Sequence, residues 1–401
     1  MKEGWKMVKL GKIVTTSNGL WKGKKPPYIN IAVIRNTNFT KDCKLRLDDI
    51  EYIDAEEKQF LTRKLEYGDI IIEKSGGSDK QPVGRPVLFN IKEGNFSYSN
   101  FTSRIRIIDN KIIDSSFLQK ALYNHYIKGS TFPLQSNTTG IHNLDFKGYL
   151  EIEIPLPPLE EQHRIVGILD ASFAKIDALK ANAEANLANA KALFQQVLAQ
   201  ELQPKEGWVE KKLGEIYDVR DGTHDSPKYH SEGYPFVTSK NLINGIIDMN
   251  NVQLISKEDY DKINERSKVD LGDILFAMIG SNLGHPAIVD FEPNFAIKNV
   301  ALFKIPSNQS NKYLLYLLSS DMIMNKMNKN SSGSSQPFVS LKFLRNFIVS
   351  LPPLEEQHRI VSTLDTLSEK CRRLEQVAQQ TIRECDALKQ SILRQAFSGE
   401  L

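Results

Sequence analysis

Short runs rich in Ile, Val, Phe and Tyr alternate with clusters of Gly, Asn and Pro through two stretches of the chain. Such runs predict strands separated by turns. The predicted strands are Ile29–Ile34, Ile70–Glu73, Val87–Ile91 and Ser103–Ile108 in the first stretch, and Ile274–Met278, Ala287–Val289 and Val300–Ile305 in the second. Apolar residues three and four apart predict one helix in each stretch, at Ser116–Lys128 and Lys312–Met327. Each stretch is therefore predicted to be a small α+β domain with long polar loops.

Two further segments have the pattern of long helices. Each begins with a Pro-Pro pair followed by a Glu-Glu pair, and Pro at the first helical position with carboxylates in the first turn is typical of a helix start. Apolar residues then step by three and four at Ile165, Leu169, Phe173, Ile176, Leu179, Ala183, Leu187, Ala190, Phe194 and Val197, and again at Ile360, Leu364, Leu367, Cys371, Leu374, Ala378, Thr381, Cys385, Leu388 and Ile392. This spacing predicts two helices of about 40 residues, each with a seam to bury.

The chain contains an internal repeat of one unit. LPPLEEQHRIV occurs at Leu156–Val166 and again, without a change, at Leu351–Val361. KEGWKMVKLGKI at Lys2–Ile13 returns as KEGWVEKKLGEI at Lys205–Ile216, and YGDIII at Tyr67 returns as LGDILF at Leu271. Each unit is predicted to consist of an opening strand, a mixed domain and a terminal helix.

Connectivity predicts how the four segments are arranged. They are a domain at 1–155, a helix at 156–203, a second domain at 204–350 and a second helix at 351–401. A helix of about 40 residues would be roughly 60 Å long. Because the second helix starts where the first one ends, burying both seams requires an antiparallel pair. We therefore expect two pseudo-repeated domains held apart by an antiparallel coiled coil.

Composition narrows the class of protein. The 401 residues are 40% apolar and 25% charged, an ordinary globular composition for about two domains plus connecting structure. No apolar run is long enough to cross a bilayer and the first residues lack a signal-peptide core, so we expect a cytoplasmic protein. The three cysteines lack the spacing of zinc sites and are expected to be reduced and structural. The net charge of +3 does not by itself identify a nucleic-acid binder, although residues 1–155 hold 24 Lys and Arg against 18 Asp and Glu.

No catalytic constellation is recognisable in the sequence. KPPYIN at Lys25–Asn30 resembles the [DNS]-P-P-Y loop of amino-methyltransferases, whose first residue accepts a hydrogen bond, whereas Lys25 can only donate. DGTHDSPKYH at Asp221–His230 holds two His and two Asp, but their spacing matches no compact set of metal ligands. His163 and His358 fit a helix start better than an active site. The sequence therefore predicts no catalytic, cofactor or metal site, and a binding and scaffolding role.

Polar loops are the candidates for contact with DNA. Leu134–Asn143 and Asn328–Pro337 lie at equivalent places and are rich in Asn, Gln, Ser and Thr, which hydrogen-bond base edges and phosphates; flexible solvated loops are the alternative. Basic residues interleaved with aromatics are compatible with phosphate contact. The candidates are Lys22, Lys24, Lys25, Tyr28, Arg35, Lys80, Arg85, Ser136, Asn137 and Thr138 in the first domain, and His224, Lys228, Tyr229, Ser239, Lys240, Asn241, Asn282, Ser334 and Gln336 in the second.

Two diverged domains that each close with LPPLEEQHRIV resemble the specificity (S) subunit of type I restriction-modification systems. The resemblance also rests on DGTHDSPKYHSEGYPFV at Asp221–Val237, GDILFAMIGSNLG at Gly272–Gly284 and SGEL at Ser398–Leu401, and it covers essentially the whole chain. The first domain departs from the pattern, because TSNGLWKGKKPPYINI stands where the second has DGTHDSPKYH.

The resemblance implies a non-catalytic role inside an enzyme complex. Each domain would be a target recognition domain that reads one half of a bipartite, asymmetric site in double-stranded DNA, and the helices would set the spacing. Two methyltransferase (M) subunits would methylate adenine N6 with S-adenosylmethionine, and two restriction (R) subunits would cleave DNA with ATP and Mg²⁺. The residues expected at helix starts and for docking are Pro157, Pro158, Glu160, Glu161, Gln162, Arg164, Pro352, Pro353, Glu355, Glu356, Gln357 and Arg359.

Two other functions remain open on the sequence alone. One is a self-contained DNA amino-methyltransferase with a degenerate KPPY loop. The other is a coiled-coil adaptor that binds only proteins. Methyl transfer by the isolated chain would favour the first, and failure to bind DNA would favour the second.

Overall fold

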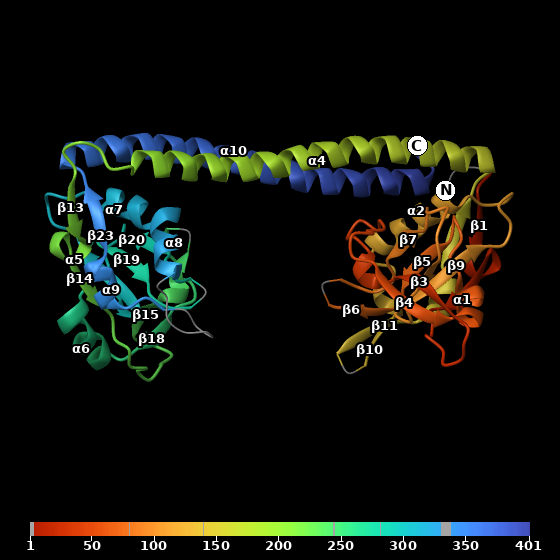
Figure 1. The fold of residues 1–401 in the computed structure, drawn as a ribbon, viewed down its shortest axis with the longest axis horizontal. Coiled ribbons are helices and arrows are strands. Elements are labelled where there is room, and N and C mark those ends of the chain that lie inside the picture. Colours follow the sequence, from red (N-terminus) through yellow and green to blue (C-terminus); the bar gives the residue numbers. More distant parts are fainter. Residues whose placement is uncertain (1–3, 80, 139, 244, 281, 330–337) are drawn as a thin grey trace. The chain divides into compact units, whose positions relative to one another are not determined.

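The computed structural model describes residues 4–79, 81–138, 140–243, 245–280, 282–329 and 338–401. It divides into two compact units, one formed by Met1–Ala183 with Gln380–Leu401 and the other by Glu184–Gln379. Each unit holds a globular domain and parts of two long helices (Figure 1). We call the globular parts domain 1 and domain 2.

Domain 1 is built on two main sheets. The first has the strand order β2-β9-β5-β7 and is antiparallel throughout, with β2 at Val14–Asn18, β9 at Thr102–Ile107, β5 at Ile70–Glu73 and β7 at Pro86–Leu88. The second has the order β4-β3-β8, with β4 at Glu51–Glu56, β3 at Tyr28–Ile34 and β8 at Phe96–Tyr98, and β3 runs parallel to β8. A smaller sheet joins β10 (Gln135–Thr138), β11 (Ile141–Leu144) and β6 (Ser75–Gly77).

Domain 2 repeats these two main sheets with different residues. The order β14-β22-β19-β20 joins Asp218–Asp221, Val300–Lys304, Ile274–Ala277 and Pro286–Ile288, again antiparallel throughout. The order β18-β15-β21 joins Gln253–Ile255, Tyr234–Thr238 and Ala296–Lys298, again with the last pair parallel. In addition, β16 (Leu242–Ile243) and β17 (Ile246–Ile247) form a short hairpin. The two domains therefore share one fold, as the repeat predicts.

Each domain begins with a strand that pairs with its last strand. In domain 1, β1 (Lys6–Lys9) pairs antiparallel with β12 (Glu153–Leu156), and in domain 2, β13 (Val209–Lys212) pairs with β23 (Ile348–Leu351). The last strand leads directly into a long helix. This pairing fixes the point at which each helix leaves its domain, and it confirms the opening strand that the sequence predicts.

The two long helices are α4 (Leu159–Glu201, 43 residues) and α10 (Leu354–Ser398, 45 residues). In the first unit, Asp177 contacts Lys389, and the Lys180 ammonium lies 2.7 Å from the Asp386 carboxylate. Residue numbers therefore rise along α4 as they fall along α10, and the two helices are antiparallel. In the second unit, Arg359 contacts the Glu201 carboxylate at 2.6 Å in the same antiparallel sense. The predicted antiparallel pairing of the helices is confirmed.

Short helices join each domain to the long ones. In domain 1, α2 (Ser115–Ile127) contributes Phe117 and Leu118 to a core shared with Leu169 of α4 and Leu393 of α10. In domain 2, α7 (Asn311–Leu318) lies between the strands and the long helices (Figure 1), and its buried side chains share a core with Leu198 and Ile360. The remaining short helices are α1 (Glu57–Arg63), α3 (Phe146–Leu150), α5 (Leu213–Ile216), α6 (Lys257–Ser267), α8 (Asp321–Lys329) and α9 (Leu341–Asn346), with 3₁₀ turns at Leu10–Lys12, Asn36–Asn38, Phe132–Leu134 and Ser239–Asn241.

The predicted count of one helix per domain was wrong. The helix predicted at Lys312–Met327 is two helices, because α7 ends at Leu318 and α8 starts at Asp321 after a break in which the Ser320 hydroxyl bonds the Leu317 carbonyl. The helix α6 was missed altogether. Only Tyr260 and Ile263 give it an apolar contact with its domain, so it lacks a periodic signal.

Part of the predicted seam was also wrong. Leu179, Leu374 and Leu388 fall at seam positions in the sequence, yet each is about half exposed (51%, 55% and 48%). Leu198, Lys389 and Leu393 are buried at neighbouring positions instead. A heptad pattern predicts which stripe of a helix is apolar. It does not show where a globular domain packs beside that stripe and so changes which helix positions are buried.

The structure also bears on cysteines and membrane segments. The cysteines at 43, 371 and 385 are buried and form no disulfide with one another. Among the described residues, no helix combines the length and the apolar character that crossing a membrane requires.

Candidate nucleic-acid interface and helix starts

The loop after β14 in domain 2 carries a fixed network of polar side chains. The buried Asp221 carboxylate accepts hydrogen bonds from Arg266 of α6 and from His224 Nε2, the latter at 3.1 Å. The other ring nitrogen of His224 lies 2.9 Å from Asn299 Oδ1. His224 is therefore held by its own domain on both ring nitrogens, while 64% of its side chain stays exposed to solvent.

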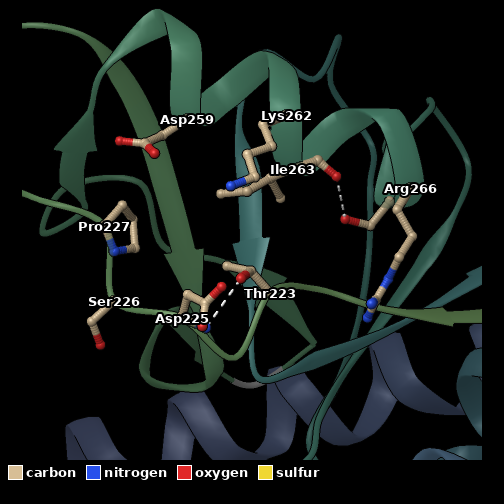
Figure 2. A pocket seen from close by; sticks show the side chains of 9 residues that line it. Thr223, Asp225, Ser226, Pro227, Asp259, Lys262, Ile263 and Arg266 are labelled. Carbon is tan, nitrogen blue, oxygen red and sulfur yellow. Dashed lines mark hydrogen bonds between the residues drawn. The ribbon is translucent and has the colours of Figure 1, made fainter.

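A pocket of about 210 Å³ adjoins this loop (Figure 2). One wall is the loop itself, where the amide of Asp225 donates to the Thr223 hydroxyl at 3.1 Å, and the other wall is α6 with Lys262 and Arg266. Further along the loop, Lys228 and Tyr229 are both exposed. The pocket combines cationic and hydroxyl groups, which suit phosphate oxygens, with the carboxylates of Asp225 and Asp259, which do not.

Ser239 and Asn241, which were predicted to contact DNA, are used inside domain 2. The Ser239 hydroxyl donates to the Asn299 carbonyl at 2.8 Å, and Asn241 accepts from the Thr238 amide at 2.9 Å. Asn282 donates to the Leu242 carbonyl at 3.2 Å. Of this group, Lys240 alone has an exposed side chain.

The loop after β2 in domain 1 presents several basic side chains. Lys22, Lys24, Lys25 and Tyr28 are all exposed, and the three ammonium groups form no ion pair with any residue in the described ranges. The loop is fastened through its backbone, because the amides of Lys24 and Lys25 each donate to the Glu56 carboxylate at 3.3 Å. Its cationic groups are thus available to phosphates on a backbone that is held in place.

Arg85 does not fit a contact with DNA. Its side chain is 6% exposed and forms a two-pronged ion pair with the buried Glu73, at 2.7 and 2.8 Å, on the strand β5. The third guanidinium nitrogen, Nη1, donates to the Phe39 carbonyl at 2.9 Å. Arg35 is more accessible, although one of its nitrogens lies 2.8 Å from the Glu51 carboxylate. Arg85 is therefore a core residue that joins two parts of domain 1.

The polar cluster Leu134–Asn143 forms the hairpin β10–β11 rather than an irregular loop. Ser136 and Asn137 are exposed on its first strand. The side chain of Thr138, together with Lys80, Ser334 and Gln336, lies outside the described residues. For these four candidates the prediction of a DNA contact stays a prediction.

Sequence reasoning overlooked Trp21, Phe101 and Arg266. Trp21 is 67% exposed and Phe101 42% exposed on the same side of domain 1 as the basic loop. The signal for Trp21 was in the string GLWKGKK, where a large apolar residue stands among three lysines. An exposed Trp in a basic loop is unusual enough to deserve a place among the candidates.

The repeated segments build the same helix start twice. Gln162 is fully buried, and its amide nitrogen donates to the carbonyls of Ile112 and Pro157 while its oxygen accepts from the Asp114 amide at 2.9 Å. Gln357 is likewise fully buried and bonds the Pro352 carbonyl and the Ser310 amide, each at 3.0 Å. Gln162 and Gln357 were predicted to dock a partner, but they tie each helix to its own domain.

Other residues of the segments face solvent in matching patterns. Arg164 bonds Glu161, and Arg359 bonds Glu356, each pair three residues apart with contacts of 2.6–2.9 Å. Hydrogen bonds from the cationic side chains of Arg359 and Lys205 lower the pKa of Glu356 to about 2. Pro158, Glu160 and Arg164 are exposed, as are Pro353, Glu355 and Arg359. The carbonyls of Pro158 and Pro353 accept the first hydrogen bond of each helix, from Gln162 and Gln357. Each Pro is therefore the residue just before the first helical position, which is one position earlier than predicted.

Replacing Gln162 or Gln357 with alanine is expected to destabilise the unit that contains it. Each change leaves at least two buried or partly buried backbone groups without that partner, at a cost of up to about 1–3 kcal/mol for each group. Urea unfolding of the single variants measures the loss. Glu160→Ala, an exposed residue of the same turn, is the matched control and should change the free energy of unfolding by less than about 0.5 kcal/mol. An equal effect of Gln162→Ala and Glu160→Ala would contradict the assignment.

One protein family matches both repeats of the chain. The model of the type I restriction modification DNA specificity domain matches the chain twice, over residues 2–188 and 205–384. The chain belongs to this family. The two matches correspond to the two units of the sequence repeat, each with its domain and much of its long helix.

Relatives in the family are specificity subunits. The chain is 26% identical to the type I restriction enzyme EcoKI specificity subunit of Escherichia coli K12, covering 100% of this chain and 89% of that protein. It is 24% identical to the MjaVIII specificity subunit of Methanocaldococcus jannaschii, covering 100% of this chain and 93% of that protein. As a member of the family the chain is a type I specificity subunit.

Solved structures share the fold over the full length. A chain from a study of the assembly and conformational transition of a type I restriction-modification system matches with a TM-score of 0.80 and 21% identity, covering 100% of this chain and 99% of that one. The HsdS subunit of Thermoanaerobacter tengcongensis matches with a TM-score of 0.59 and 20% identity, covering 100% and 98%. These likenesses support the fold of two domains with two long helices.

Proposed function

We propose that each domain reads one half of a bipartite, asymmetric DNA site and that the paired helices set the distance between the halves. The observation that carries this proposal is that one fold occurs twice with different surface loops, while the helix starts are identical. Unlike loops suit unlike half-sites, because direct readout depends on a few side chains in each reading surface. Identical helix starts suit a partner that binds twice.

The partners in this proposal are two M subunits, which methylate adenine N6 with S-adenosylmethionine, and two R subunits, which cleave DNA with ATP and Mg²⁺. The chain itself contributes recognition and docking. Among the described residues, no group of three or more His, Cys, Asp and Glu side chains is arranged to hold a metal ion. In this proposal the M and R subunits carry out the methyl transfer and the cleavage.

Exposed apolar side chains on the long helices support docking of the M subunits. Leu179 and Leu388 are exposed in the first unit, and Leu193, Leu374 and Val377 in the second. Apolar side chains exposed at seam-like positions are typical of helix faces that a partner covers. The exposed part of each LPPLEEQHRIV segment adds a charged region with the same residues in both units.

Changing both Leu179 and Leu388 to serine is expected to weaken binding of the M subunit at least tenfold while leaving the chain folded. Exposed leucines contribute little to folding, whereas apolar anchors at an interface often contribute more than 1 kcal/mol each. Titration of the M subunit against labelled chain measures the affinity. Leu61→Ser, which changes an exposed leucine of α1 away from the long helices, is the control. Unchanged affinity in the double variant would remove this face from the docking surface.

Reconstitution tests the proposed function. The chain alone should transfer no methyl group, and the chain with its M subunit should methylate adenine at one split sequence. Methyl transfer by the isolated chain that is abolished by Tyr28→Ala, with DNA binding retained, would favour a self-contained methyltransferase instead. A chain with its M subunit that binds no DNA in a gel shift at moderate salt would favour a protein adaptor.

A further inference from the structure

Domain 1 has a pocket of about 450 Å³ beside its basic loop. The exposed rings of Trp21 and Phe101 lie at its edge, and the buried side chains of Leu20 and Val33 form part of its lining. Two large rings left in solvent beside an apolar base form a surface on which a flat group can stack. The pocket therefore has the shape and chemistry to hold something planar.

Polar atoms in the same pocket have no partner. Arg35 Nε and Ser99 Oγ are both buried, and neither has a hydrogen-bond partner among the described residues. Buried polar atoms in folded proteins are nearly always hydrogen-bonded, so two such atoms in one pocket indicate a ligand with acceptors or donors at its edge. Asn100, which is exposed in the turn that joins β8 to β9, adds an amide to this rim.

At the equivalent place in domain 2, the polar side chains of the loop hydrogen-bond to their own domain. Thr223 donates its amide to the Ile297 carbonyl as Leu20 does to the Tyr98 carbonyl, so His224 occupies the position that Trp21 occupies in domain 1. There His224 bonds Asn299, and Ser226 bonds Lys298, in the turn that corresponds to Ser99–Phe101. Domain 2 closes this place with internal hydrogen bonds, whereas domain 1 leaves it open. Because the two domains share one fold, the opening in domain 1 is a feature of its sequence.

The charge around the pocket indicates the class of ligand. Lys22, Lys24 and Lys25 follow Trp21 on the loop, and their ammonium groups are unpaired within the described ranges. The lining also holds the Glu51 carboxylate, whose charge is offset by its ion pair with Arg35 Nη1 at 2.8 Å, so Nε is the Arg35 nitrogen left without a partner. A flat group with a polar edge, attached to a polyanion, is a nucleobase. We propose that this pocket takes one base of the half-site read by domain 1 out of the stack, with Trp21 and Phe101 as the stacking surface and Arg35, Ser99 and Asn100 on the base edge. This proposal rests on the proposed function.

Mismatched duplexes distinguish an extruded base from one that is read in a groove. The full chain with its M subunit is titrated with the methylated sequence in which each position of both half-sites, other than the methylated adenines, carries a mismatch in turn. Unpairing costs less at a mismatch, so binding should tighten about tenfold at one position, in one half-site only. Every other mismatch in the half-sites should weaken binding, as expected for groove readout.

Variants connect that position to the pocket. Trp21→Ala and Phe101→Ala should each weaken binding to the matched duplex about tenfold or more and remove the tightening at the mismatch. Tyr52→Ala, which changes an exposed ring of domain 1 outside the pocket, should keep both. Unchanged circular dichroism and an unchanged melting temperature show that a variant is folded. If Trp21→Ala does not fold, Phe101→Ala still tests the pocket, and the reverse also holds.

The outcomes separate this inference from the function on which it rests. A wild-type complex that prefers no DNA sequence would overturn both. A selective wild-type complex for which no mismatch tightens binding, or in which Trp21→Ala and Phe101→Ala bind as the wild type does, would overturn the inference alone. So would a loss in Tyr52→Ala as large as the loss in Trp21→Ala.

Discussion

Arg85→Ala is expected to lower the free energy of unfolding of the first unit by about 3–5 kcal/mol. The change removes the cation that neutralises Glu73, whose side chain is 1% exposed, and leaves a buried carboxylate without its partner. It also frees the carbonyls of Asn36 and Phe39, which accept hydrogen bonds from the same guanidinium. Urea unfolding of wild type and variant, followed by circular dichroism, measures the difference.

Two companion variants show whether the buried pair is the cause. Glu73→Ala/Arg85→Ala removes both charges and should be less destabilised than the sum of the single variants, because neither charge is left alone. Arg46→Ala breaks an exposed pair with Asp48, in which the side chains are 53% and 66% exposed, and should cost no more than about 1 kcal/mol. A stable Arg85→Ala chain with weakened DNA binding would instead support the original prediction that Arg85 contacts DNA.

Lengthening both long helices by four residues is expected to abolish methylation at the native half-site spacing. Four residues add about 6 Å to a helix, which corresponds to roughly two base-pair steps. Inserting them after Ala188 in α4 and between Arg372 and Ala378 in α10 keeps the two helices matched in length. Methylation should move to a gap about two base pairs longer, or be lost if the added turn rotates one domain away from the DNA.

A control insertion distinguishes the effect of longer helices from the effect of four added residues elsewhere in the chain. Four residues added beside the exposed Glu93, in the loop between β7 and β8, increase the size of domain 1 without touching either long helix. This variant should methylate at the native gap. Native spacing in the helix variant as well would mean that the helices do not set the distance.

The strands and the long helices could be predicted from the sequence because their signals are local. Ile70–Glu73 is the strand β5 with the predicted bounds, and Ser116–Lys128 differs from α2 by one residue at each end. The repeat predicted that both domains would share a fold, and the shared strand orders confirm it. The long helices run 43 and 45 residues against a predicted 40 or so.

Side-chain roles could not be predicted in the same way, because they depend on contacts between residues far apart in the chain. Arg85 in GRP has the appearance of a basic turn residue, and only the fold brings it to Glu73 and the Phe39 carbonyl. Gln162 stands in a charged string, yet its partner Asp114 comes from the start of α2. The helix seam likewise could not show that Leu179 would be exposed.

In the proposed function, this chain selects a split DNA sequence for a separate methyltransferase. Sequencing of methylated adenines in DNA from cells that carry the chain and its M partner tests it most directly. We expect one asymmetric motif in two parts with a fixed gap, absent when either protein is omitted. Methylation at a continuous motif, or methylation that persists without this chain, would contradict it.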